Sequence, residues 1–187
     1  EYCNPCEAIV DGQLRETSAL EEIEHFSLDG IDYEAFNTSG GLGTLCTSLA
    51  GKVQNLNYKT VRYPGHRDII KLLVRDLQLG QPERRHILKE VMEASIPITL
   101  QDVVLVFVSV VGMRGGRLEQ QTYARKIYSQ DVNGQLLSAI QLTTAAGICA
   151  MVDLVLQGRL PQQGLVRQEQ ALLTDFLANR FGQYYSA

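Results

Sequence analysis

The sequence predicts an α+β fold in which an antiparallel-rich mixed sheet is covered by helices. Three dipeptides, Asp11-Gly12, Asp29-Gly30 and Asn133-Gly134, supply the positive φ angles that tight two-residue hairpins need. Stretches with the apolar spacing of helices separate these hairpins. The order is strands, helices, a further hairpin and helices, without the regular βαβ alternation that indicates a parallel sheet.

The strands are expected around these turns. Residues 24–28 and 31–37 flank Asp29-Gly30, and residues 58–63 form a further strand. Residues 103–111 and 117–129 flank the turn at 113–116. Because residues 103–108 are apolar on both faces, we expect a central strand covered on each side, with the more polar 117–129 nearer an edge.

Five helices are expected, over residues 41–50, 67–77, 82–94, 143–157 and 169–181. The helix at 143–157 is apolar nearly all round and is predicted to be deeply packed, with Gly158 ending it and Thr143 or Thr144 either capping its start or offering hydroxyls to a ligand. Pro82 suits the first turn of its helix. The residues expected to face the core in the other helices are Ile69, Ile70, Leu73 and Leu77, then Ile87, Leu88 and Val91, and finally Leu172, Leu173, Phe176 and Leu177.

Composition narrows the function classes. The chain has 187 residues, 45% of them hydrophobic, and a net charge of -4, which fits one soluble globular domain. Its basic residues are scattered, so no nucleic-acid partner is expected. The uncharged stretch 135–152 contains polar residues and is shorter than the ~20 apolar residues of a membrane span, so no membrane partner is expected and the location is expected to be cytoplasmic.

The N-terminal segment suggests a piece of a longer chain. Glu1 begins the sequence, and residues 1–5 resemble no leader. Four cysteines without a regular framework suit reduced thiols. Cys3 and Cys6 form a C-x-x-C, which is typical of redox or zinc chemistry, but no second pair completes a metal set and the alternative is a half-buried strand end. No metal is expected.

A glycine loop, residues 37–46, follows a strand and opens a helix. It differs from the dinucleotide fingerprint because Cys46 stands at the third glycine position, and Arg62 and Tyr63 stand where the ribose-binding acid is expected. Glycine N–H groups at a helix start favour negative charge, so the loop is a candidate carboxylate site. The alternative is a turn that packs a helix tightly against the sheet.

The second candidate segment is 58–66, a strand that ends at Pro64-Gly65. Arg62 can hold a carboxylate through two parallel N–H bonds. His66 is the one histidine outside a strand or helix pattern, and it is a candidate proton donor or a cap of the following helix.

These two segments, AFNTSGGLGTL and NYKTVRYPGHRDIIKLLVRDL, resemble second-domain signatures of bacterial saccharopine dehydrogenases and the related lysine 6-dehydrogenases. The similarity continues through PITLQDVVLVFVSVVG, QQTYARKIYS, SAIQLTTAAGICAMVDLVLQG and FLANRFG. Residues 1–5 occupy the place of a Tyr-Cys-Gly-Gly-Leu-Pro turn in the fungal saccharopine reductase branch, and Asn4-Pro5 departs from it.

The resemblance implies the substrate-binding and dimerisation domain of a two-domain dehydrogenase, whose N-terminal Rossmann half binds NAD or NADP and is absent from this chain. The helices at about 143–181 are expected to pack against that half. The implied reaction is hydride transfer at the CH–NH group of an amino acid, in lysine biosynthesis or degradation, and the isolated chain is expected to be an inactive homodimer. Thr38, Ser39, Gly40, Arg62 and Tyr63 are implied to bind substrate, with Cys3 near the nicotinamide. The catalytic candidate, His66, does not come from the resemblance but from its position just after the strand-ending turn.

Two alternatives stay open at this point. A non-catalytic dimerisation or ligand-binding module could use the same fold, because no complete catalytic set lies within these residues. A carboxynorspermidine or homospermidine synthase would use adjacent chemistry.

Overall fold

The computed structural model describes residues 1–186, and the chain forms two compact units, Glu1–Pro97 and Ile98–Ala187. All strand pairs in the described residues are antiparallel, and they form four small sheets rather than one mixed sheet. The predicted α+β class is confirmed. Each unit is described by itself.

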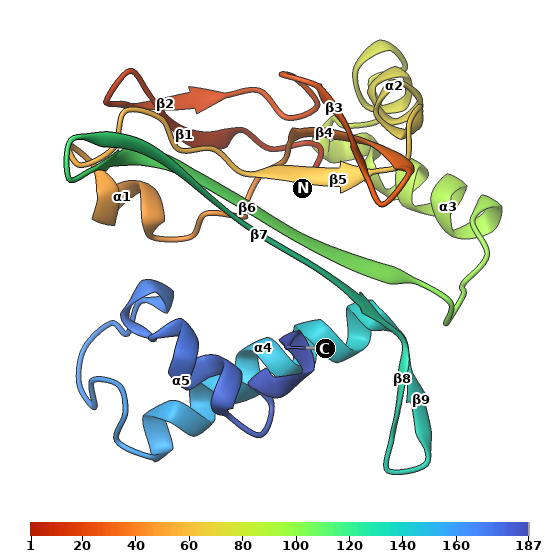
Figure 1. Cartoon of the computed structure of the whole chain (residues 1–187). Helices are drawn as coiled ribbons and strands as arrows, with labels where there is room; N and C mark the ends of the chain where they lie inside the picture. Colours follow the sequence, from red (N-terminus) through yellow and green to blue (C-terminus); the bar gives the residue numbers. More distant parts are fainter. Residues whose placement is uncertain (187) are drawn as a thin grey trace. The chain divides into compact units, whose positions relative to one another are not determined.

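The first unit holds a hairpin, a three-stranded sheet and three helices (Figure 1). The hairpin pairs β1 (Cys6–Val10) with β2 (Gln13–Thr17), and the sheet has the order β3 (Glu24–Leu28), β4 (Ile31–Asn37), β5 (Lys59–Arg62). The helices are α1 (Leu45–Leu49), α2 (His66–Lys71) and α3 (Arg85–Ser95). A π-helical turn, Leu72–Asp76, extends α2, and a 3-10 turn, Pro82–Arg84, precedes α3.

The hairpin predictions hold because the turn residues adopt left-handed conformations. Asp29 has φ 54° and Gly30 has φ 76°, and these values place β3 and β4 on either side of a two-residue turn. Asp11-Gly12 and Asn133-Gly134 do the same for their hairpins.

One core cluster joins the sheet to the helices of the first unit. Phe36 of β4 is fully buried and shares this cluster with Ile70, Val74 and Leu88. The predicted inward stripe of α2 is wrong in part, because Ile69 and Leu77 are exposed and Ile70 and Val74 are the buried pair. Ile70 and Val74 are four residues apart, an ordinary helical spacing, so the buried line passes through them, and only Leu77 follows the π-helical turn that rotates later side chains. In α3, likewise, Leu88 is buried whereas Ile87 and Val91 are exposed.

The second unit consists of two hairpins followed by helices. A long hairpin pairs β6 (Val103–Arg114) with β7 (Arg117–Tyr128), and a short one pairs β8 (Gln130–Val132) with β9 (Gln135–Leu137). The helices are α4 (Ala139–Leu156) and α5 (Leu173–Ala178), with 3-10 turns at Gln168–Gln170 and Gly182–Tyr185. Over the predicted helix 169–181 the chain forms two short pieces, a 3-10 turn and α5, and Leu172 and Leu173 are exposed.

The prediction of a central β6 strand is wrong. β6 pairs with β7 alone, and both strands are exposed from Phe107 round to Thr122. A continuous run of apolar residues is typical of strands buried on both faces of a sheet. An edge strand whose apolar face is exposed in the single chain can have the same composition.

Helix α4 starts four residues earlier than predicted. Ser138 is its N-cap in a reciprocal capping box with Gln141, and the Asp102 carboxylate accepts the N–H groups of Ala139 and Ile140. The expected cap, Thr143, lies inside the helix and donates its hydroxyl to the Ala139 carbonyl oxygen.

One face of α4 is buried and the other is not. Leu142, Ala146, Ala150 and Leu154 are buried, whereas Ile148, Val152 and Leu156 are exposed, so the deep packing predicted for this helix is only half realised. α4 is the one helix among residues 1–186 that is long and apolar enough to cross a membrane, a property that core helices of soluble proteins share.

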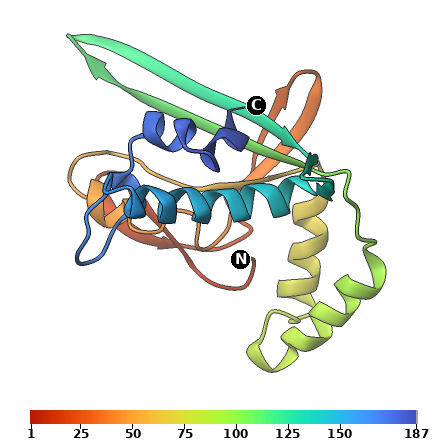
Figure 2. The ribbon, with the colours of Figure 1, turned by 90° about the horizontal axis from the view of Figure 1, so that it is seen from below.

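A buried carboxylate ties the C-terminal segment to α4, which runs beside α5 (Figure 2). Asp153 accepts hydrogen bonds from Asn179 Nδ2 at 2.7 Å, Arg180 Nη2 at 2.8 Å and Gln157 Nε2 at 2.7 Å. These bonds to Asn179, Arg180 and Gln157 hold the pKa of Asp153 below its ordinary value of 3.8.

Asp153→Asn is therefore expected to lower the Tm of the protein at pH 7, because the amide leaves Arg180 without a counter-charge and one donor unsatisfied. A carboxylate with a lowered pKa stabilises the fold above pH 3.8, and this stabilisation is lost as the pH falls through the folded-state pKa. Calorimetric scans should thus show a Tm difference from the wild type that is full at pH 7 and shrinks in acid. Asp175→Asn is the control and should have the smaller effect, because Asp175 pairs with Arg159 and its carboxylate is more exposed than that of Asp153. Equal Tm values for wild type and Asp153→Asn at pH 7 would contradict this role.

Candidate functional site

The pairing of β4 with β5 brings polar residues from distant parts of the sequence onto one face of the sheet. Glu34 lies opposite Arg62, and Phe36 lies opposite Thr60. Directly opposed residues of an antiparallel pair project from the same face, so these four side chains share it. Just beyond β4, the Thr38 hydroxyl lies 2.7 Å from the Thr60 hydroxyl, and both threonines are buried.

Glu34 fixes the turn that carries His66. Its side chain is buried, with the residue 2% exposed, and its two carboxylate oxygens accept the backbone N–H groups of Gly65 at 2.9 Å and Arg67 at 2.6 Å. Gly65 has φ +94°, a conformation that a residue with a Cβ rarely adopts. The helix-capping function considered for His66 therefore belongs to Glu34. Sequence reasoning missed Glu34, and the available signal was an acid inside the otherwise apolar stretch 33–36.

His66 lies in an aromatic setting. Its Nε2 is 3.1 Å from the hydroxyl of Tyr2, and its ring stacks on Phe36 with the ring centroids 6.3 Å apart. Burial lowers the pKa of His66 below its ordinary 6.5, and the neighbouring Arg62 charge lowers it further, whereas Glu34 acts in the opposite direction. His66 is consequently neutral at pH 7. In this form one ring nitrogen accepts a hydrogen bond and the other donates one.

Arg62 is half-buried and has no acidic partner among residues 1–186. Its Nη1 donates to the carbonyl oxygen of Val61 at 2.8 Å, and none of the ion pairs in this part of the chain includes it. A guanidinium has five N–H donors, so several remain for an anion. The alternative role for Arg62, pairing with a neighbouring acid, finds no acid at ion-pairing distance in the described residues.

Tyr63 lies apart from these groups. Its ring stacks on that of Tyr33 with the centroids 5.7 Å apart, and Tyr33 in turn stacks on Phe26. Tyr33 alternates with Glu34 along β4, so this aromatic row belongs to the opposite face of the sheet. The structure does not bring Tyr63 together with Arg62.

The glycine loop is built differently from the prediction. α1 has five residues, Leu45–Leu49, instead of the ten expected, so its terminus supplies little helix dipole. The ring of Tyr58 lies directly on Gly41, where an added Cβ would come within 2.1 Å of the ring. Ser39 donates both its N–H and its hydroxyl to the carbonyl oxygen of Glu1, at 3.1 and 3.2 Å. Ser39 is thus engaged in holding the N-terminus.

A cavity of about 300 Å³ lies between this loop and β1. Its lining consists of Pro5, Glu7, Thr38, Gly40, Gly41, Leu42, Gly43 and Tyr58. Two of the predicted substrate-binding residues, Thr38 and Gly40, are among them. Glu7 is the one charged residue in this lining, which contains no Lys, Arg or His.

Neither the cavity nor the loop fits the pyrophosphate of a dinucleotide. Phosphate groups are bound where helix N-termini and cations converge, and here the helix is short and the lining carries a carboxylate. A nicotinamide cofactor therefore needs a binding site other than this loop.

Cys3 and the other cysteines are free thiols. Cys3 is half-buried against the core cluster of the first unit and does not line the cavity. Burial raises the pKa of the Cys46 thiol, and the nearby Glu7 carboxylate adds to this effect. No group of three His, Cys, Asp or Glu side chains within residues 1–186 is arranged to hold a metal ion.

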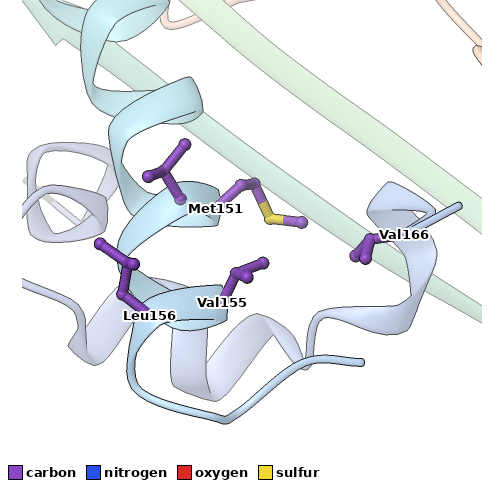
Figure 3. A pocket seen from close by; sticks show the side chains of 5 residues that line it. Met151, Val155, Leu156 and Val166 are labelled. Carbon is purple, nitrogen blue, oxygen red and sulfur yellow. The ribbon is translucent and has the colours of Figure 1, made fainter. Parts of the chain in front are cut away.

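A second cavity, of about 240 Å³, lies in the other unit and is lined by apolar side chains. Figure 3 shows Met151 and Val155 reaching from α4 toward Val166 of the following segment. With no polar side chain in its lining it has no group for acid, base or charge recognition.

Comparison with known families agrees with this geometry. Residues 1–183 match the family described as the saccharopine dehydrogenase C-terminal domain. The match spans both units and confirms the resemblance drawn from the glycine loop and the 57–77 segment. The chain therefore belongs to the saccharopine dehydrogenase C-terminal domain family.

Proposed function

We propose that this chain is the substrate-binding domain of an NAD(P)-dependent oxidoreductase that acts on the CH–NH group of an amino acid, in lysine biosynthesis or degradation. Family membership supports the oxidoreductase class. The observation that carries the substrate assignment is Arg62, a half-buried guanidinium without an acidic partner in residues 1–186, on the same sheet face as the neutral His66.

Arg62 is assigned to the substrate carboxylate. The planar guanidinium fork matches the two oxygens of a carboxylate, and partial burial strengthens the pairing relative to water. Thr38 and Thr60 share one hydrogen bond between their hydroxyls and carry no charge, so Arg62 is the charged group of the site.

His66 is assigned to proton transfer at the substrate nitrogen. Its lowered pKa keeps the ring neutral at pH 7, so that it can take a proton from an ammonium group or return it to an amine. Tyr2 and Phe36 hold the ring in place through the hydroxyl contact and the stacking described above. A nicotinamide cofactor supplies or accepts the hydride. We propose that another part of the protein binds this cofactor, and that the helices of residues 143–181 pack against that part.

Arg62→Lys tests the assignment in the protein that carries this chain together with its nucleotide-binding part. The lysine keeps the charge and loses the fork, so the KM for the amino-acid substrate should rise roughly 10- to 100-fold, corresponding to about 1.5–3 kcal/mol for a charged hydrogen bond. Dinucleotide affinity and Tm should stay unchanged.

Arg15→Lys on β2 is the matched control, because Arg15 is exposed and lies outside the site. An unchanged KM in Arg62→Lys, with or without a fall in Tm, would remove Arg62 from the site and favour a ligand-independent dimerisation module.

We also propose that two copies of the chain associate through β6. The two edges of the long hairpin differ in charge: β6 has no charged residue before Arg114, whereas β7 carries Arg117, Glu119, Arg125 and Lys126. Charges on an edge strand prevent edge-to-edge pairing, so β7 is protected and β6 is open to a partner strand. An isolated two-stranded hairpin is at best marginally stable in water, and pairing β6 with β6 of a second copy would produce four strands.

Val110→Lys should convert this dimer to a monomer. Val110 is 61% exposed in the middle of β6, and a lysine there would be buried beside the partner strand. Gln121→Lys is the control because Gln121 lies directly opposite Val110 on the protected strand. Light scattering at tens of micromolar should give twice the chain mass for the wild type and the control, and the single mass for Val110→Lys. A wild-type protein with the single mass at this concentration would refute the association.

A further inference from the structure

The segment that carries Tyr2 is held to the first unit on both sides of this residue. Before it, the carbonyl oxygen of Glu1 accepts the N–H and the hydroxyl of Ser39, at 3.1 and 3.2 Å. After it, the side-chain oxygen of Asn4 accepts a hydrogen bond from Arg85 Nη2 at 3.2 Å. The backbone around Tyr2 is therefore fixed, although it belongs to no helix or strand.

The Tyr2 ring lies in the same aromatic cluster as His66. Its centroid is 5.9 Å from that of His66 and 6.2 Å from that of Phe36, and Phe36 also stacks on His66. These separations are those of aromatic rings in contact, so each ring restricts the other two. The cluster presents the Tyr2 hydroxyl to one nitrogen of His66, with Oη 3.1 Å from Nε2.

This contact distinguishes the two ring nitrogens of His66. Nε2 is paired with the Tyr2 hydroxyl, whereas Nδ1 has no hydrogen-bond partner in the described part of the chain. A neutral imidazole has a proton on one nitrogen and a lone pair on the other, and a hydroxyl both donates and accepts. Tyr2 can therefore pair with Nε2 in either tautomer, and Nδ1 is the nitrogen that is left for a ligand.

The charged groups around His66 do not bond to its ring. Burial and the Arg62 charge on β5 lower the pKa of His66, and Glu34 on β4 acts in the opposite direction. Arg67 and Asp68, the next two residues of α2, form an ion pair with each other at 3.0 Å. Within residues 1–186 no charged side chain is hydrogen-bonded to the imidazole, so the acceptor available to a protonated Nε2 is a neutral hydroxyl.

We propose that Tyr2 is the positioning residue of His66: its hydroxyl, held at Nε2, directs Nδ1 to the substrate nitrogen and accepts the Nε2–H when Nδ1 takes a proton. In that step the N–H bond of the substrate ammonium group breaks, its electron pair stays on the substrate nitrogen, and a new N–H bond forms at Nδ1. The positive ring then donates from Nε2 to Tyr2, and a hydrogen bond from a charged donor is stronger than one between neutral groups. This inference rests on the proposed function, in which His66 transfers the proton.

Tyr2→Phe removes the hydroxyl and keeps the ring. In the protein that carries this chain together with its nucleotide-binding part, kcat for the amino-acid substrate should fall roughly 10-fold, which is part of the total effect of a general acid–base group. The KM should stay within about twofold of the wild type, because Arg62 keeps the carboxylate contact.

The pH dependence of kcat/KM should change as well. His66 must be neutral to take a proton, so kcat/KM declines as the pH falls through the pKa of His66. Without the Tyr2 hydroxyl the positive ring loses its acceptor, and this pKa should fall further. The acid limb of the profile should therefore move to lower pH in Tyr2→Phe.

The side-chain nitrogens of His66 provide a measurement that needs no turnover. Nuclear magnetic resonance of the same protein, carrying isotope-labelled histidine, follows the protonation of each ring. The His66 signals are identified by their absence in His66→Gln. They should titrate at lower pH in Tyr2→Phe than in the wild type.

Tyr185→Phe is the matched control, because the Tyr185 hydroxyl also makes one hydrogen bond, at 2.7 Å to the carbonyl oxygen of Thr143, in the other unit. This variant should lower the Tm at least as much as Tyr2→Phe does. It should leave kcat, the pH profile and the His66 signals unchanged, and it thereby separates a general loss of stability from the loss of the contact with His66.

The outcomes distinguish the positioning role of Tyr2 from the proton transfer assigned to His66. If His66→Gln loses activity while Tyr2→Phe keeps the wild-type kcat or the wild-type titration of His66, the positioning role is overturned and the proposed function stands. If Tyr2→Phe shifts the titration but His66→Gln keeps full activity, proton transfer by His66 is overturned, and the assignment of Nδ1 falls with it.

Discussion

The buried carboxylate of Glu34 is the interaction on which the candidate site depends. A carboxylate removed from water is costly unless hydrogen bonds compensate it, and here two backbone N–H groups do so. Those two groups belong to Gly65 and Arg67, so the bonds fix the residue between them, His66, relative to β4. They also satisfy donors at the start of α2, which no side chain of that helix caps. Glu34 also lies opposite Arg62 in the sheet. It is therefore next to both His66, assigned to proton transfer, and Arg62, assigned to carboxylate binding.

The site that results has its charges divided between two places. Arg62, with no acidic partner among the described residues, lies at the end of β5, and the uncompensated Glu7 carboxylate lines the cavity next to the glycine loop. The hydroxyls of Thr38 and Thr60 share one hydrogen bond, in which one O–H donates to the other oxygen. The neutral His66 adds a group that exchanges protons without adding charge.

Local signals predicted the hairpins of this fold well. Asp29-Gly30 and Asn133-Gly134 determine backbone conformation by themselves, and the strand bounds 24–28 and 31–37 agree with the structure. Helix faces were predicted less well. Ile70 and Val74 form the buried line of α2 in place of Ile69 and Leu77, and because all four residues are apolar the sequence does not say which line is covered. β6 was assigned to the centre of a sheet because its composition is that of a buried strand, and composition does not say whether the covering surface lies in the same chain.

For the candidate site, the sequence indicated the two segments but not their partners. Thr38, Gly40, Arg62 and His66 lie on or beside the sheet face where the pairing of β4 with β5 brings the segments together. Glu34 and Glu7 were missed, since acids in strands carry no distinguishing spacing and their roles arise from contacts between distant residues. Tyr63 was included because of its position after Arg62, yet strand alternation sends it to the opposite face against Tyr33.

The central claim is that one sheet face, with Arg62, His66 and the glycine-loop cavity, binds the amino-acid substrate. A crystal structure of the complete protein with the amino-acid substrate and the oxidised cofactor tests it most directly. The account predicts a substrate carboxylate within hydrogen-bonding distance of the Arg62 guanidinium and the reacting nitrogen next to His66. Substrate density lying on the Tyr63 face, or against the apolar cavity of α4, with Arg62 uncontacted, would contradict it.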